Sequence, residues 1–259
     1  MTTTIMAAVT ATQANKTKGV TSILFATLII TMLTLVNPIG ASANERRLNV
    51  TLDDGSDIKV FLFEPDDQGE GPWPLTILIS GGVGNEYIAR AQFWLGRKLA
   101  EHGWAIAVPV SPDNKPFTGE NARRIPKVIA KLQKDEKVMY GKSLLVGVSS
   151  GGSSALEIAT QEPTQYYGVI AAPGILRPGL TFGDLHNLPV YLRIAENDTF
   201  NWDDQLPEMM LRLTRANANV DAELIDNGSH VFQLDWQDLG RWLDSLKVPL
   251  SPPALEYIP

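Results

Sequence analysis

The chain has 259 residues, a formal net charge of −7, 44% hydrophobic residues and no cysteine. This acidic balance argues against nucleic acid and anionic membranes as partners, and the lack of thiols excludes disulfides and thiolate metal sites. No internal repeat or linker-like segment divides the sequence, so one sizeable domain is expected after the N-terminal segment.

Residues 1–43 have the pattern of a secretory signal peptide. Two lysines precede an uncharged apolar run, residues 19–36, and an A-x-A-like cleavage site lies immediately before Asn44. The prediction is a secreted or periplasmic protein whose catalytic domain spans residues 44–259 and has no stable membrane association after cleavage. The apolar run approaches the length of a spanning helix, so an uncleaved anchor is the alternative.

Strand and helix patterns alternate along the rest of the chain. Residues 48–52 and 58–63 flank an Asp-Gly turn, which is typical of a β-hairpin. The further expected strands are 75–79, 104–110, 143–148, 169–172, 188–194 and 221–225, and the expected helices lie at 88–99, 125–132, 153–159, 206–213 and 239–246. This alternation predicts an α/β fold with a mostly parallel central sheet, helices on both faces and an antiparallel N-terminal hairpin.

A serine between glycines follows the strand expected at 143–148. The segment Gly147-Val148-Ser149-Ser150-Gly151 matches the G-x-S-x-G pattern of a nucleophile elbow, a sharp strand-to-helix turn that exposes the serine hydroxyl. The residues two before and two after the serine approach each other across such a turn, where a Cβ would clash. Ser149 is therefore the candidate nucleophile, and a glycine-rich turn without chemistry is the alternative.

A serine nucleophile needs a base, and the chain has three histidines. His102 precedes a glycine at a predicted helix end, where it suits the helix dipole, and His186 lies in an irregular stretch. His230 follows the strand expected at 221–225 and so lies at a strand's carboxyl end, where α/β sheets place functional groups. His230 is therefore the candidate base.

A carboxylate is needed to orient the imidazole of that base. The strand expected at 188–194 runs directly into a segment that contains Glu196 and Asp198. Asp198 is the preferred acid and Glu196 is the alternative. Either residue could instead be an ordinary solvated carboxylate of a turn, without a catalytic role. The order Ser149, Asp198, His230 is the serine, acid, histidine order of α/β-hydrolases.

On these residues the chain resembles the α/β-hydrolase superfamily, in the small, lidless esterase or dienelactone-hydrolase-like style, over nearly all of residues 46–248. The segment 80–84 looks like the H-G-G-x-G oxyanion loop of that family, with Ser80 in place of the usual histidine. The resemblance implies an oxyanion hole made by the backbone N–H groups of Ser150 and Gly82, with Val83 as the alternative to Gly82.

The resemblance also implies an open site. Lids of this superfamily tend to follow the sixth strand, where only residues 173–187 precede the next strand, so no large lid is expected. Phe117, Trp202 and Phe232 are the expected substrate-binding residues.

The predicted function is an exported serine hydrolase that cleaves small-molecule or polymer carboxylic esters through an acyl-enzyme on Ser149, without a metal or cofactor. A serine peptidase on the same fold and a catalytically silent binding protein are the alternatives, because a fold alone does not establish catalysis.

Overall fold

An eight-stranded sheet is the central element of the structure. A computed structural model of the chain describes residues 45–65 and 69–249, so the predicted signal peptide lies outside the described residues. The strands are β1 (Glu45–Thr51), β2 (Asp57–Phe63), β3 (Trp73–Ile79), β4 (Ala105–Pro109), β5 (Val138–Gly147), β6 (Tyr166–Ala171), β7 (Pro189–Ala195) and β8 (Asn219–Ile225). They are ordered β1-β2-β4-β3-β5-β6-β7-β8.

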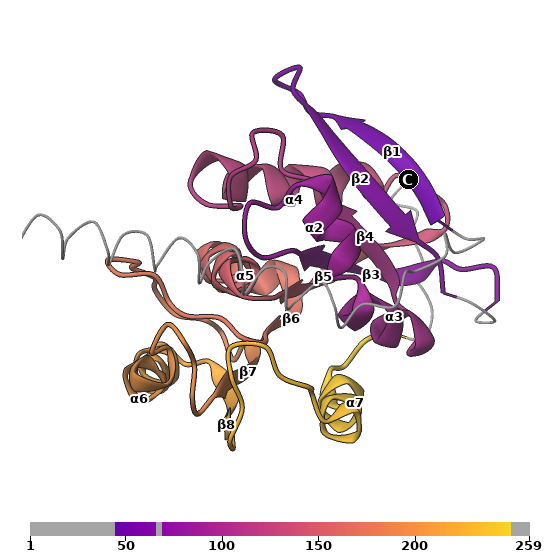
Figure 1. Cartoon of the computed structure of the whole chain (residues 1–259). Helices are drawn as coiled ribbons and strands as arrows, with labels where there is room; N and C mark the ends of the chain where they lie inside the picture. The colour runs from indigo at the N-terminus through magenta and orange to yellow at the C-terminus, as the bar shows by residue number, and fades with distance from the viewer. Residues whose placement is uncertain (1–44, 66–68, 250–259) are drawn as a thin grey trace, which may run out of the picture. The chain divides into compact units, whose positions relative to one another are not determined.

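The predicted α/β fold is confirmed. β1 pairs antiparallel with β2, and β2 pairs antiparallel with β4, whereas all strands from β4 to β8 pair in parallel. The helices are α2 (Glu86–Ala91), α3 (Trp94–Glu101), α4 (Glu120–Leu132), α5 (Ser150–Gln161), α6 (Leu206–Arg215) and α7 (Trp236–Ser245), with short 3₁₀ turns at Pro163–Gln165 and Asp203–Gln205. Figure 1 shows α4, α5 and α6 on one face of the sheet and α3 and α7 on the other.

Apolar residues of the parallel strands explain why helices cover both faces. All five residues of β4 are buried, and six of the seven residues of β3 are buried. Strands of this kind cannot leave a face in water, so most of the connections between them contain a helix that packs on the sheet; the segment between β6 and β7 is an irregular loop instead. Exposure of these apolar faces to water would remove most of the free energy that stabilises the fold.

One predicted helix is interrupted in the structure. The single helix expected at 88–99 is two helices, α2 and α3, separated at Gln92 and Phe93. At this break, the side chain of Gln92 is buried, and its amide oxygen accepts a hydrogen bond from the N–H of Gly81 in the loop after β3. Apolar spacing alone cannot show such a break, because the same residues face the sheet on both sides of it.

The strand order reverses between β3 and β5. The chain passes from β3 to β4 on one side and then crosses to β5 on the other side of β3. In open α/β sheets, ligands bind at the carboxyl ends of the strands at such a switch point. The loop after β3 and the turn after β5 both lie there, so the two predicted halves of the oxyanion hole are brought to one place.

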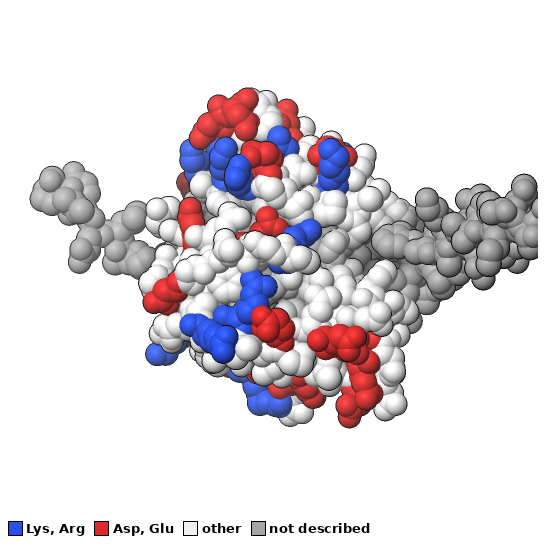
Figure 2. All heavy atoms as spheres, turned by 90° about the vertical axis from the view of Figure 1, so that its left-hand side faces the viewer, with Lys and Arg blue, Asp and Glu red and all other residues white. Residues whose placement is uncertain are grey.

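Charged residues on the described surface are of both signs. On the face that carries α4, α5 and α6, acidic and basic side chains lie close to one another rather than in separate areas (Figure 2). That face therefore offers no continuous basic surface of the kind that binds nucleic acid. Within the described ranges, every helix is too short or too polar to cross a membrane.

Candidate active site

Ser149 occupies a strained turn between β5 and α5. Its backbone has φ 58° and ψ −125°, in the left-handed half of conformational space that non-glycine residues rarely adopt. A Cβ on Gly147 would overlap the carbonyl group of Gly151, and a Cβ on Gly151 would overlap the carbonyl oxygen of Ile79. These overlaps explain why glycines flank the serine, and the turn leaves Ser149 only partly buried.

The structure brings Ser149, His230 and Asp198 into one hydrogen-bonded chain. Ser149 Oγ lies 2.8 Å from His230 Nε2, and His230 Nδ1 lies 2.7 Å from Asp198 Oδ2. Both the imidazole and the carboxylate are buried, at 1% and 4% residue exposure. With Asp198 accepting from Nδ1–H, the neutral imidazole presents an acceptor at Nε2 to the serine hydroxyl.

The other two histidines lie away from this chain. His102 is exposed at the C-terminal end of α3, and its Nδ1 is 2.8 Å from the carbonyl oxygen of Lys98. His186 is exposed in the loop before β7, 3.8 Å from Asp184. Neither forms a contact with Ser149, Asp198 or His230.

The acid and base loops are held together by backbone hydrogen bonds. The N–H of Asn197 donates to the carbonyl oxygen of Gly228 at 3.0 Å. The N–H of Glu196 donates to the carbonyl oxygen of Ile225, also at 3.0 Å. The carboxylate of Glu196 is exposed and accepts from the N–H of Asn227 at 3.0 Å, so it faces the loop surface. The geometry thus pairs Asp198, and not Glu196, with His230.

Two aromatic rings cover the imidazole of His230. The ring centroids of Phe200 and Trp202 lie 4.7 Å and 4.9 Å from that of His230, with planes at 83° and 82° to it. The N–H of Phe200 also donates to Asp198 Oδ1 at 2.8 Å. Asp198, Phe200 and Trp202 therefore come from one loop after β7 and all contact His230.

The glycine loop after β3 packs directly against the serine turn. A Cβ on Gly81 would lie 2.7 Å from the carbonyl oxygen of Val148 and 3.0 Å from the Cβ of Ser149. The N–H of Gly81 donates to Gln92 Oε1 at 2.6 Å, while Ser150 Oγ donates to the carbonyl of Gly82 at 3.2 Å. Gly82 adopts φ 61°, which suits glycine, and neighbouring Val83 is 44% exposed.

A partly buried ion pair lies beside the first turns of α5. Arg177 Nε is 3.0 Å from Glu157 Oε2, and Arg177 Nη2 donates to Ser154 Oγ at 3.0 Å. Burial lowers the pKa of Arg177, and the charge of Glu157 opposes that shift. The pair joins the segment after β6 to the helix that follows the serine.

The predicted substrate-binding residues fall in different places. Trp202 lies against His230, as described above. Phe117 is 1% exposed and packs in the hydrophobic core, so the expectation that it contacts substrate is corrected: its ring is covered by other apolar side chains of the core. Phe232 is partly buried two residues after His230, and its contact with substrate stays a prediction.

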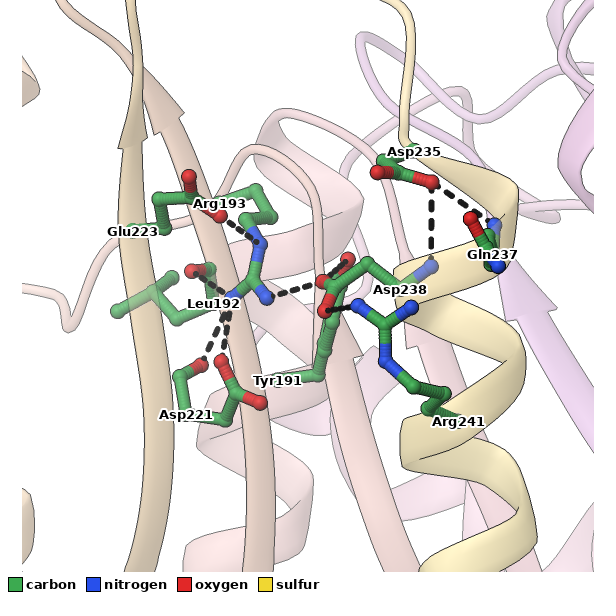
Figure 3. Close-up of polar contacts among 9 residues, drawn as sticks. All are labelled: Tyr191, Leu192, Arg193, Asp221, Glu223, Asp235, Gln237, Asp238 and Arg241. Atoms are coloured by element: carbon green, nitrogen blue, oxygen red, sulfur yellow. Dashed lines mark hydrogen bonds and ion pairs between the residues drawn. The ribbon is translucent and has the colours of Figure 1, made fainter.

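An arginine cluster ties together the elements that carry the acid and the base (Figure 3). The side chain of Arg193, on β7, is 3% exposed and lies 2.9 Å from Asp221 of β8 and 2.6 Å from Asp238 of α7. Glu223 lies 3.3 Å from its Nε, and its guanidinium stacks 3.7 Å from the ring centre of Tyr191. Asp198 follows β7, and His230 lies between β8 and α7, so this cluster links the strands and the helix that precede or follow these two residues.

Three residues near the site were not predicted from the sequence. Gln92 bonds the glycine loop, Arg177 contacts α5 and Phe200 covers the base. Phe200 lies two residues after the candidate acid on a strand-end loop, and this position could have indicated that its ring lies near His230. Gln92 and Arg177 carry no local signal, because their partners are distant in the sequence. Among the described residues, no three His, Asp or Glu side chains are grouped so as to hold a metal ion.

Known proteins agree with this architecture. Residues 122–249 match the sequence model of the family described as "Putative esterase". No curated protein matches the chain.

Several solved structures share the fold. A carboxylesterase of Bacillus cereus is 16% identical, over 72% of this chain and 93% of that one, with a TM-score of 0.59. A dienelactone hydrolase of Anabaena variabilis is 18% identical, over 78% and 97%, with a TM-score of 0.58. An S-formylglutathione hydrolase of Agrobacterium tumefaciens is 12% identical, over 79% and 94%, with a TM-score of 0.57. These structures show that the chain shares their α/β fold, and the esterase family model matches its residues 122–249.

Proposed function

We propose that the protein is a serine hydrolase that cleaves carboxylic esters through an acyl-enzyme on Ser149. The observation that carries this proposal is the hydrogen-bonded chain from Ser149 through His230 to Asp198, with distances of 2.8 Å and 2.7 Å. A hydroxyl within hydrogen-bond reach of a base, which is itself oriented by a carboxylate, is the arrangement that activates a serine nucleophile.

In the first half of the reaction, Ser149 Oγ attacks the ester carbonyl carbon while His230 Nε2 takes the hydroxyl proton. The resulting tetrahedral intermediate collapses when the alcohol oxygen leaves, and His230 returns the proton to that oxygen. In the second half, His230 removes a proton from water, which attacks the acyl carbon, and then protonates Ser149 Oγ as the carboxylic acid departs. Asp198 orients the imidazole and stabilises its protonated form throughout.

The oxyanion is held by the backbone N–H groups of Ser150 and Gly82. Ser150 begins α5, so its N–H lies at the positive end of the helix and has no partner in the preceding turn. The N–H of Gly81 is already bonded to Gln92, which leaves Gly82 or Val83. The carbonyl of Gly82 points to Ser150 Oγ, and in a trans peptide the N–H of Val83 then points away, which favours Gly82.

The site assignment is tested by chemical labelling and by paired variants. A fluorophosphonate that reacts with activated serines is expected to add one label to the wild-type protein, on the peptide that contains Ser149. The Ser149→Ala variant should take no label and lose hydrolysis of nitrophenyl esters by several orders of magnitude. Ser150→Ala is the matched control, because its proposed role uses only the backbone. Label on Ser150, or an active Ser149→Ala variant, would refute the assignment.

The protein is also proposed to be exported, with residues 1–43 removed as a signal peptide. This part rests on the sequence pattern before Asn44. Intact-mass measurement of protein from the periplasm or medium should give a chain that begins at Asn44. A full-length species in the membrane fraction would favour an anchor instead.

A further inference from the structure

The loop that carries the candidate acid also surrounds the candidate base. Asp198 bonds His230 Nδ1, while the rings of Phe200 and Trp202 stand nearly perpendicular to the imidazole, with centroids 4.7 Å and 4.9 Å away. The two rings also contact each other, with centroids 6.1 Å apart. Alternate residues of one short loop thus form an aromatic wall beside the base.

The two sides of this wall face different environments. His230 and Asp198 are buried, at 1% and 4% exposure, whereas Phe200 is 37% exposed and Trp202 is partly buried. Phe200 therefore covers the imidazole with part of its ring and presents the rest to solvent. An exposed aromatic surface next to a reactive group is suited to contact an apolar part of a substrate.

The proposed reaction decides which part of the substrate comes near this wall. The alcohol oxygen must receive its proton from His230 Nε2, so it comes within hydrogen-bond distance of that atom. The first atoms of the alcohol group are then beside the imidazole, which Phe200 and Trp202 flank. The acyl group is bonded to Ser149 Oγ and extends from the carbonyl carbon on the other side of the leaving bond.

We propose that Phe200, supported by Trp202, is the contact for the alcohol part of the ester and makes the enzyme prefer esters of bulky apolar or aromatic alcohols. This inference rests on the proposed ester hydrolysis and extends it to the substrate class. The alcohol contributes to the acylation step alone, since it has left before the acyl-enzyme is hydrolysed. The preference is therefore expressed in kcat/KM, which reports the steps up to the first irreversible one.

The test compares two ester series with the purified protein, using release of acid as the signal. One series keeps the acetyl group and changes the alcohol from methanol to butanol to benzyl alcohol, and the other keeps methanol and lengthens the acyl group. Phe200→Ala retains the backbone N–H that bonds Asp198. Met210→Ala is the matched control, because Met210 has a similar exposure of 38% but lies on α6.

For Phe200→Ala, kcat/KM for benzyl acetate is expected to fall about tenfold more than that for methyl acetate, since loss of apolar contact changes discrimination by about that factor. The ratios within the acyl series should remain at wild-type values, and Met210→Ala should change neither series. Circular dichroism and thermal unfolding confirm that each variant is folded. Should Phe200→Ala fail to fold, Phe200→Leu is expected to show the same selective loss to a smaller degree.

Equal loss on every ester would overturn the inference, because Phe200 would then act only by holding His230. Loss confined to the acyl series would overturn it as well, since the wall would then contact the acyl group. Both results leave the proposed function standing, because the wild-type protein is active in each. A wild-type protein that hydrolyses no ester and takes no fluorophosphonate label would instead refute the proposed function, and this inference with it.

Discussion

Ser149 lies on a turn that is shaped by backbone atoms, whereas the imidazole of His230 is held in place by side chains. Around the serine, the close approaches are between glycines and carbonyl groups of β3 and α5. Around the histidine, the contacts come from the carboxylate of Asp198 and the rings of Phe200 and Trp202. The hydrogen bond between Ser149 and His230 therefore joins two regions that are stabilised by different kinds of contact.

The region of the base has a second layer of side-chain contacts. Arg193 connects β7 to β8 and α7 through Asp221, Glu223 and Asp238. Beside the serine turn, Arg177 pairs with Glu157 of α5, but the close approaches that shape the turn itself are between glycines and backbone carbonyl groups. The comparison teaches that the serine turn should respond to substitution in an all-or-none manner, because a backbone overlap cannot be partly relieved. The base region should respond gradually, because side chains can be trimmed one contact at a time.

The largest effect is expected for Gly147→Ala. The added Cβ would overlap the carbonyl group of Gly151, and neither backbone segment can move without opening the turn. We expect loss of folded protein or destabilisation by about 4 kcal/mol or more, the range of severe core overlaps. Gly183→Ala is the control, because a Cβ there meets nothing within 4 Å. Thermal and urea unfolding measure both, and a folded, active Gly147→Ala variant would show that the turn is not rigid.

Asp198→Asn should leave the protein folded and reduce turnover greatly. The amide would favour the wrong tautomer of His230, and the same replacement in a serine protease lowers kcat about 10⁴-fold. Glu196→Gln is the matched control, since that exposed carboxylate bonds the N–H of Asn227 and not the imidazole. Steady-state kinetics on one nitrophenyl ester decides between them. A greater loss from Glu196→Gln would transfer the orienting role to that residue.

Arg193→Met should weaken the base region without removing its catalytic groups. Removal of the guanidinium leaves Asp238 with fewer donors, but Asp221 and Glu223 are 46% and 62% exposed at their side chains and remain solvated. We expect a loss of about 1–3 kcal/mol in the free energy of unfolding, in the range for hydrogen bonds to charged groups, with screening of the exposed partners. Urea unfolding at neutral pH measures it. No change in stability would mean that water replaces the cluster at little cost.

The same variant should change how stability depends on pH. Burial raises the pKa of Asp238, but hydrogen bonds from Arg193 and Tyr191 outweigh it and hold the pKa below its ordinary value of 3.8. A carboxyl with a lowered pKa in the folded state stabilises the protein above its ordinary pKa, and this contribution is lost as the pH falls through the folded value. The wild-type protein should therefore lose stability more steeply than Arg193→Met below about pH 4. Parallel curves for the two proteins would contradict this assignment.

The smallest effect is expected for Ser150→Ala. Its side chain makes one hydrogen bond, to the carbonyl of Gly82 at 3.2 Å, and the proposed oxyanion contact uses the backbone N–H that alanine keeps. A single hydrogen bond contributes about 1 kcal/mol, so kcat/KM should fall by no more than about fivefold. Kinetics on the same ester as for Asp198→Asn gives the comparison. A loss as large as that of Asp198→Asn would mean that the Ser150 hydroxyl itself is needed.

Local sequence patterns were sufficient to predict those features of the fold and the site that neighbouring residues determine. The alternation of apolar strands with helical spacing predicted the parallel sheet, and G-x-S-x-G with its strand and helix neighbours predicted the turn at Ser149. The choice of Asp198 over Glu196 was a preference in the sequence, and the structure decides the geometry because only Asp198 lies against His230. Phe117 was misplaced, since a loop aromatic gives no local indication of which way it turns.

By itself, the sequence determined the α/β fold, the position of the sharp turn and the chain order of serine, acid and histidine. These follow from periodicity and from glycines that a tight turn requires, which are properties of neighbouring residues. The tertiary structure alone decided that Gln92 holds the glycine loop, that Phe200 and Trp202 flank His230 and that Arg193 joins β7 to β8 and α7. These contacts depend on strand order and on helix placement over the sheet, which bring together residues whose separation in the sequence carries no signal of contact.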